Sequence, residues 1–306
     1  MTMKPRTFPL CVVVLSVLSG CARSTEPEGK SASTDPTNAW QEQVRKIIWV
    51  AYSPSTGDPN IGLQPKVEEI VADLHVLRSA GFTGLVTYGM TGIAGKELPR
   101  LAEEAGFRGL IVGIWDPKSN EELATAKSAA SRALVLGFCV GNEGLGNRYS
   151  LAELKKAIQG LRASTGKNVT TTQPIDDYYQ NDALMKIGDW VFPNAHPYFH
   201  GRIGPQSAVR WTKAEYDRMK SKTRQIVIFK EVGLPTAGDK DGDLSEVGQD
   251  AYYVGLTATD VPFVYFEAFD LTWKRDPPVE PHWGLFRSNR TPKPVATRLM
   301  GKKRDQ

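Results

Sequence analysis

The sequence predicts an α/β fold, a single (β/α)8 TIM barrel preceded by an export signal and a flexible tether. Three observations lead to that prediction. Eight short β-rich runs recur at a mean spacing of about 30 residues, the length of a βα unit. Helix start and stop signals lie between the runs. Carboxylate residues stand where several runs end, which is where such barrels carry their functional groups.

The eight runs are mostly continuous apolar stretches, as expected for strands buried on both faces of a parallel sheet. They are Ile47–Tyr52, Gly84–Tyr88, Gly109–Trp115, Leu134–Val140, Val169–Gln173, Trp190–Ala195, Gln225–Lys230 and Pro262–Phe269. The fifth run is rich in threonine and is the weakest. Alternation of strands and helices predicts a parallel α/β fold, and it leaves a doubly wound open sheet as the alternative to the barrel.

Helix start and stop signals between the runs support this alternation of strands and helices. In a capping box, a Ser or Thr precedes the helix and a Glu follows three residues later. The pairs that fit are Ser119 with Glu122, Ser150 with Glu153, and Thr212 with Glu215. After the second pair, apolar residues recur on one helical face until Gly166, a typical C-terminal cap. We therefore expect helices to begin at these three positions.

The N-terminus has the pattern of a secretory signal peptide. Lys4 and Arg6 precede an apolar run, Leu10 to Leu18, which is shorter than the about 20 residues that a spanning helix needs. The run leads into Ser19-Gly20-Cys21, and the whole segment resembles the bacterial lipobox. That resemblance implies cleavage before Cys21 and a diacylglycerol on its sulfur. An ordinary signal peptide with an incidental cysteine is the alternative.

These features divide the chain into four parts. Residues 1–20 are predicted to be a lipoprotein signal peptide. Residues 21–40 are predicted to hold the lipidated cysteine and a flexible tether rich in Ser, Thr, Pro, Glu and Lys. Residues 41–298 form the predicted barrel, and residues 299–306 a basic tail. We therefore expect an exported protein anchored to a membrane through Cys21, at the periplasmic face of the outer membrane or at the cell surface.

The composition gives no sign of a metal, cofactor or nucleic-acid site. A net charge of +4 is too mild to predict a nucleic-acid partner. His196, His200 and His282 lack the close spacing of metal ligands. Cys139 lies in an apolar run, so we expect it to be a buried core residue. We expect a monomer that needs no cofactor.

Polar residues at the ends of the runs indicate where the active site lies. Glu143 follows the fourth run, Glu231 follows the seventh, and Glu267 lies near the end of the eighth. Tyr88 ends the second run and His196 follows the sixth, so we expect both to lie near a bound substrate. Because the carboxyl ends of all barrel strands meet at one mouth, these side chains are expected to face a common cavity.

Two carboxylates across one barrel mouth suit the cleavage of a glycosidic bond. One must be protonated to donate to the leaving oxygen, and the other must be ionised to meet the oxocarbenium-like centre. A separation of about 5–5.5 Å permits direct attack with retention, whereas about 6.5–9.5 Å leaves room for water and inversion. Either glutamate alone is more simply a solvated loop residue, and it is their joint position that favours catalysis.

Several motifs, in this order along the chain, make it resemble glycoside hydrolase family 17, the β-1,3-glucanases and β-1,3-glucanosyltransferases. The motifs are Val140-Gly141-Asn142-Glu143, Asn194-Ala195-His196-Pro197-Tyr198, Lys230-Glu231-Val232-Gly233-Leu234-Pro235-Thr236, Tyr265-Phe266-Glu267-Ala268-Phe269-Asp270 with Trp273-Lys274, and His282-Trp283-Gly284-Leu285-Phe286. The resemblance extends from about Trp49 to Pro294. It implies a barrel that carries its acid after strand four and its nucleophile after strand seven.

The resemblance implies a role for each matched residue. Glu143 would be the general acid/base and Glu231 the nucleophile of a retaining mechanism. Asn142 would bond the sugar 2-hydroxyl, and Tyr198 would orient the ionised Glu231. The substrate would be a β-glucan oligosaccharide or polysaccharide.

The same resemblance places Glu267 and Lys274 at the sugar subsites, and one departure concerns stacking. The family usually has a Trp where this chain has Leu234. The stacking platform is then either missing or supplied by Trp273 or Trp283.

Four functions remain open from sequence. They are hydrolysis of β-1,3-glucan, transglycosylation on the same substrate, glucan binding without catalysis, and solute binding for a transporter. The presence of both glutamates counts against the third. Solute-binding lipoproteins usually have two domains, which counts against the fourth.

Overall fold

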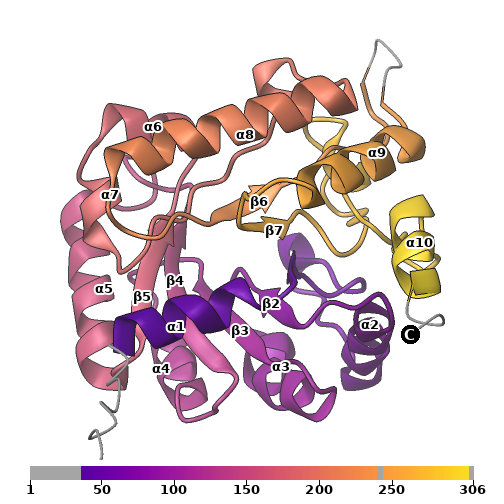
Figure 1. Cartoon of the computed structure of the whole chain (residues 1–306). Helices are drawn as coiled ribbons and strands as arrows, with labels where there is room; N and C mark the ends of the chain where they lie inside the picture. Colours follow the sequence, from indigo (N-terminus) through magenta and orange to yellow (C-terminus); the bar gives the residue numbers. More distant parts are fainter. Residues whose placement is uncertain (1–35, 240–243, 303–306) are drawn as a thin grey trace, which may run out of the picture. The chain divides into compact units, whose positions relative to one another are not determined.

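The computed structural model of the protein describes residues 36–239 and 244–302 (Figure 1). Within these residues, parallel strands form one sheet in the order β5-β4-β3-β2-β1-β7-β6. The strands are β1 (Trp49–Ala51), β2 (Gly84–Val86), β3 (Gly109–Ile114), β4 (Val135–Asn142), β5 (Asn168–Thr172), β6 (Phe229–Val232) and β7 (Phe263–Tyr265). Seven of the eight predicted runs therefore contain a strand, and the parallel α/β prediction is confirmed.

Helices connect the strands and cover the outside of the curved sheet (Figure 1). They are α1 (Pro36–Arg45), α2 (Val67–Ser79), α3 (Gly92–Glu104), α4 (Asn120–Ala129), α5 (Leu151–Thr165), α6 (Ile175–Gln180), α7 (Leu184–Ile187), α8 (Pro205–Lys222), α9 (Glu246–Thr257) and α10 (Pro294–Lys302). None of the helices in the described ranges is long and apolar enough to cross a membrane.

The sixth predicted run, Trp190–Ala195, is not a regular strand, yet it links the two edge strands of the sheet. Parallel bridges join Asn194 to Pro174, just after β5, and to Glu231 in β6. Pro193 has no N–H to donate, so a continuous ladder cannot form through this segment. The sheet is thus TIM-barrel-like, with an irregular segment between β5 and β6.

Buried side chains form two clusters, one on each face of the sheet. Trp49 and Ala51 of β1 belong to the inner cluster, whereas Val50, between them, packs with the helices. This alternation is what a strand produces when both of its faces are buried. Cys139 is buried in the inner cluster, as expected.

Helix α1 begins earlier than the predicted boundary at residue 41. The Trp40 indole N–H donates to the Leu136 carbonyl at 2.8 Å, and its ring lies 5.0 Å from that of Trp190. Val44 is buried and accepts a hydrogen bond from the Trp49 indole. These contacts are with the first residues of β1 and β4, so α1 covers the amino-terminal ends of the strands. At the other end, α10 extends four residues past the predicted limit of 298.

Two of the three predicted helix starts are confirmed. The Ser119 hydroxyl accepts from the Glu122 N–H, and Ser150 with Glu153 forms a complete capping box. The third is wrong, because α8 begins with Pro205 in its first turn and Thr212 lies inside it. Proline suits the first turn, where its missing N–H costs nothing, and this signal outweighed the capping-box pattern.

Candidate active site

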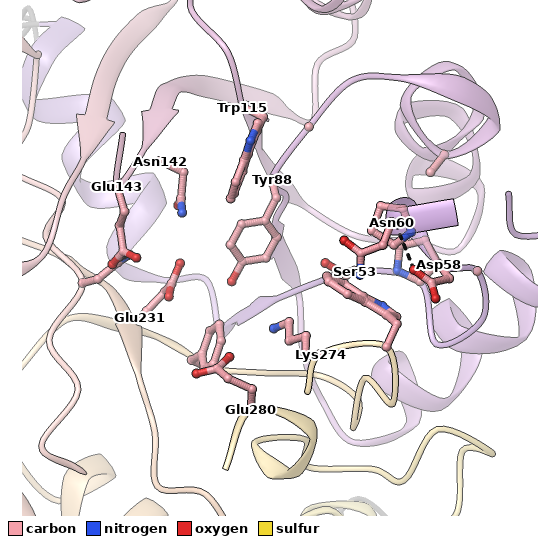
Figure 2. Close-up of a pocket in the computed structure, with 18 of the residues that line it drawn as sticks. Ser53, Asp58, Asn60, Tyr88, Trp115, Asn142, Glu143, Glu231, Lys274 and Glu280 are labelled. Atoms are coloured by element: carbon pink, nitrogen blue, oxygen red, sulfur yellow. Dashed lines mark hydrogen bonds between the residues drawn. The ribbon is translucent and has the colours of Figure 1, made fainter. Parts of the chain in front are cut away.

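A cavity of about 1210 Å³ lies at the carboxyl ends of the strands (Figure 2). Seven of the predicted site residues line it, namely Tyr88, Asn142, Glu143, His196, Glu231, Trp273 and Lys274. The loop after β1, from Ser53 to Pro65, forms a further wall that includes Asp58 and Asn60. Among the predicted site residues, the structure therefore brings together positions up to 186 apart, from Tyr88 to Lys274.

Irregular pairing precedes each of the two catalytic candidates. On β4, Cys139 pairs with Thr170 and Asn142 with Thr172, so three steps along β4 match two along β5. A β-bulge of this kind re-aims the side chains that follow it, and bulges are enriched beside active sites. Glu143 comes next and has φ 49°, which places it in the left-handed region that non-glycine residues seldom occupy.

The second irregularity lies in β6. Phe229 pairs with Phe263 and Val232 with Tyr265, so three steps on β6 again match two on β7. Successive side chains of a regular strand point to opposite faces. The irregularity explains how two neighbours in this strand, Lys230 and Glu231, can direct their charged groups to the same place.

The environment of Glu143 favours a proton. Its side chain reaches the solvent of the cavity, yet desolvation by the surrounding protein, followed by the charge of Glu231, raises its pKa above the usual value. Asn194 Nδ2 donates to Glu143 Oε1 at 2.7 Å, which opposes the rise. The Thr172 hydroxyl donates to Asn194 Oδ1 at 2.9 Å, so the orientation of this amide is fixed.

The environment of Glu231 favours the ionised form. The residue is only 5% exposed, and burial raises its pKa. The Lys230 charge and a hydrogen bond from His196 outweigh burial and lower the pKa to about 2. His196 Nε2 lies 3.1 Å from Glu231 Oε2, and Lys230 Nζ is paired with Oε1. Two facing carboxyl groups thus have pKa values shifted in opposite directions, which is the arrangement that acid and nucleophile require.

Tyr198 does not line the cavity. It lies in a short 3₁₀ helix, Tyr198–His200, and its ring packs against those of Phe199 and Trp283. Its expected role in orienting Glu231 stays a prediction. Tyr88 lines the cavity, and the charge of Glu231, after burial, raises the pKa of its hydroxyl.

Glu267 lies beneath the cavity wall, paired with Lys274. The Lys274 ammonium donates to both carboxylate oxygens, at 2.8 and 2.9 Å, and itself lines the cavity. Burial raises the pKa of Glu267 to about 7 against the opposing charge of Lys274. Of this pair, Lys274 therefore faces the cavity, whereas Glu267 holds Lys274.

Burial distinguishes the two tryptophans that were predicted as alternative stacking platforms. Trp283 is wholly buried in the inner cluster and cannot contact a ligand, whereas Trp273 lines the cavity. Two further rings stand in the cavity wall with large exposed faces, Trp115 at 43% and Phe199 at 54%. The Arg148 guanidinium lies 4.2 Å from the centroid of the Trp115 ring.

Sequence reasoning missed three polar residues of this site. Lys230 and Asn194 contact Glu231 and Glu143 directly, and both lie within motifs already singled out. Glu280 extends into the cavity near Lys274 (Figure 2). Its signal was weaker, because it stands two positions before the His282 motif. Over the ranges that the structure describes, no group of three or more His, Cys, Asp or Glu side chains could hold a metal ion.

The fold and the sequence were compared with known proteins. Among solved structures, a family 17 β-1,3-glucanosyltransferase from Rhizomucor miehei matches with a TM-score of 0.67 and 23% identity, covering 80% of this chain and 95% of that one. An endo-laminarinase from Formosa Hel1_33_131 matches with a TM-score of 0.69 and 18% identity, covering 86% and 89%. At these identities the likeness shows the shared fold.

Curated relatives share more sequence. The probable beta-glucosidase btgE of Aspergillus flavus is 27% identical over 252 residues, 77% of this chain and 41% of the relative. The chain thus spans about two fifths of the length of the first relatives it matches. A glucan 1,3-beta-glucosidase of Arthroderma benhamiae is 28% identical over 268 residues, 76% of this chain and 85% of the relative.

The family model that matches is the BtgE/BtgC glycoside hydrolase domain, over residues 50–284. Apart from Trp49, the first residue of β1, that range includes all strands of the sheet, and it includes Glu143 and Glu231. The match covers well over half of the chain and agrees with the family 17 relatives and structures, so this chain belongs to the BtgE/BtgC domain family within glycoside hydrolase family 17.

Proposed function

We propose that this protein is a retaining glycoside hydrolase that acts on β-1,3-glucan or a related β-glucan. The observation that carries the proposal is the opposite pKa shift of two carboxyl groups that line one cavity, upward for Glu143 and downward to about 2 for Glu231. Relatives that are named as glucan 1,3-beta-glucosidases support the substrate class.

The proposed reaction has two steps. Glu231 attacks the anomeric carbon while Glu143 donates its proton to the glycosidic oxygen, so the leaving sugar departs neutral and a glycosyl ester forms on Glu231. Glu143, now ionised, takes a proton from water. The oxygen of that water then attacks the anomeric carbon, which releases Glu231 as a carboxylate and restores the original anomeric configuration. Asn142, Tyr88, His196, Trp273 and Lys274 line the cavity and are the proposed sugar contacts.

Transglycosylation is the second candidate. It uses the same glycosyl-enzyme but resolves it with a sugar hydroxyl instead of water. A glucanosyltransferase of the same fold supports this second candidate. Its structure has been solved alone and, for an active-site mutant, in complex with laminaritriose. Incubation with laminaripentaose distinguishes the two, since a transferase forms products longer than the substrate. Glucan binding without catalysis is disfavoured by the opposite pKa shifts of Glu143 and Glu231.

Azide rescue tests the assigned roles. With an aryl β-laminaribioside, whose leaving group needs little protonation, Glu143→Ala should form the glycosyl-enzyme but hydrolyse it slowly. Azide needs no base and should restore turnover as the β-azide. Glu231→Ala lacks the nucleophile, so azide attacking from its side should yield the α-azide. Swapped azide configurations would reverse the two roles, and an unaffected rate in both variants would end the catalytic proposal.

We further propose that the protein is exported and anchored through Cys21, which lies outside the described residues. The proposal rests on the lipobox resemblance alone. Cys21→Ser should release the protein from the membrane fraction or block its processing. A wild-type protein found wholly in the soluble fraction would contradict the anchor and leave export untouched.

A further inference from the structure

We propose that Lys230 is a positioning residue that holds Glu231 ionised and turns the Asn142 amide so that its nitrogen faces the substrate. The inference rests on the proposed function, because it assigns a task within that reaction. Lys230 is only 1% exposed, and its ammonium meets Asn142 Oδ1 at 2.7 Å, the Glu231 carboxylate and the face of the Tyr88 ring, 4.2 Å from the centroid.

A buried lysine ammonium lowers the stability of the fold unless partners surround its charge. Removing an ammonium from water is strongly unfavourable without a partner. Here the charge meets a carboxylate, an amide oxygen and an aromatic face, which together compensate for the burial. Within the described residues, the carboxylate that pairs with this ammonium is that of the proposed nucleophile, Glu231.

The contact with Asn142 fixes the direction of hydrogen bonding. A lysine ammonium has three donors and no acceptor. The hydrogen-bond partner decides which atom of an amide is the oxygen, so the Asn142 atom that faces this ammonium is the oxygen. Nδ2 is then the group that remains for the cavity, and Asn142 can only donate to a sugar oxygen. Lys230 thus couples the nucleophile to the residue expected to bind the 2-hydroxyl.

The same ammonium is useful in both steps of the reaction. Before attack it favours the carboxylate form of Glu231, as does His196. In the glycosyl ester that group is neutral, and Lys230 then faces the ester oxygen. When water releases the ester, the returning negative charge forms beside an ammonium already in place, which needs no rearrangement at that moment.

Two substitutions of Lys230 separate its charge from its hydrogen bond. Lys230→Met removes both, whereas Lys230→Gln keeps an N–H that can reach Asn142 without a charge. The assay measures kcat/KM against pH for an aryl β-laminaribioside and for its analogue that lacks the 2-hydroxyl on the cleaved sugar. In kcat/KM, the acid limb reports the carboxylate of the free enzyme.

Both variants should lose the charge effect. The wild-type acid limb is expected near the Glu231 pKa of about 2, and losing an opposite charge should move it upward by about 1 to 3 pH units. The hydrogen-bond effect should differ between them. Wild type should prefer the 2-hydroxyl substrate by at least about 100-fold. Lys230→Gln should keep most of that preference, and Lys230→Met should reduce it to below about 10-fold.

Lys293 provides a matched control. It is almost as buried as Lys230 and is paired with Asp270 at 2.7 Å, but the residues that it bonds do not line the cavity, whereas those bonded by Lys230 do. Lys293→Met should lower thermal stability without moving the acid limb or changing the 2-hydroxyl preference. The proposal for Lys230 is overturned if its Met variant keeps the wild-type acid limb, or if the preference stays undiminished.

Failure of the proposed function is recognised separately. A wild-type protein that cleaves neither substrate refutes that function. The charge effect is then measured directly, by following the Glu231 carboxyl in ¹³C-labelled protein by NMR, where Lys230→Met should still raise its pKa. If Lys230→Met does not fold, the Lys230→Gln variant decides the charge effect alone, and an unmoved acid limb there rejects it.

Discussion

Asn194→Ala should raise the pKa of the proposed acid and extend activity to higher pH. Asn194 Nδ2 donates to Glu143 Oε1 at 2.7 Å, and this bond lowers the pKa by favouring the ionised carboxyl. A hydrogen bond to a charged group contributes about 1.5–3 kcal/mol, and one pKa unit corresponds to about 1.4 kcal/mol. Because Glu143 also reaches solvent in the cavity, the lower end applies, a rise of about 1 pH unit.

The measurement is kcat/KM against pH with laminaritriose, whose leaving sugar needs a proton. The alkaline limb reports loss of that proton from Glu143, so it should move upward in Asn194→Ala, while the acid limb stays in place. Thr172→Val is the graded control, because it removes only the hydroxyl that holds Asn194 Oδ1. It should produce a smaller shift in the same direction. An alkaline limb that stays or moves downward would refute the reasoning.

Three further predictions concern other groups. Glu267 has a pKa of about 7 in the folded protein, against 4.5 ordinarily. Between those two values the folded state binds more protons than the unfolded state. The free energy of unfolding should therefore fall as the pH rises through that window, by up to about 3 kcal/mol. Glu267→Gln should flatten this dependence in thermal unfolding between pH 5 and 7.5. Arg290→Met leaves the fully buried Asp73 without its ion pair and should cost about 3–5 kcal/mol in denaturant unfolding, whereas Arg100→Met, in an exposed pair, should cost under about 1. Trp115→Ala should raise KM for laminaripentaose about 10-fold, if roughly 50 Å² of its indole face is covered by sugar, and an unchanged KM would remove that ring from the binding surface.

The sequence was informative where chemistry and burial coincide. Glu143 and Glu231 could be placed because each follows a continuous apolar run, and parallel strands bring their carboxyl ends together. The same logic placed Tyr88 and His196, which the structure finds in the cavity wall. The period of about 30 residues was enough to predict the parallel sheet.

The features that the sequence could not show depend on the register of strand pairing and on how deeply each side chain is buried. The irregular register of β4 and β6 leaves no mark in the amino-acid order, yet it directs Lys230 to the nucleophile. Whether Trp273 or Trp283 faces the ligand depends on which of them the inner cluster buries. The sixth run was predicted as a strand because its apolar pattern is strong, and only the effect of Pro193 on the ladder shows why it is not one.

The position of α1 has a practical consequence for handling this protein. Trp40 and Val44 bind the helix to the first residues of the strands, at the end of the barrel away from the cavity. A fusion partner or a solid support joined just before Pro36 would therefore be attached on the closed end. Immobilised in that way, the protein would keep its cavity open to a polymeric ligand, and the attachment and the polymer would not compete for space.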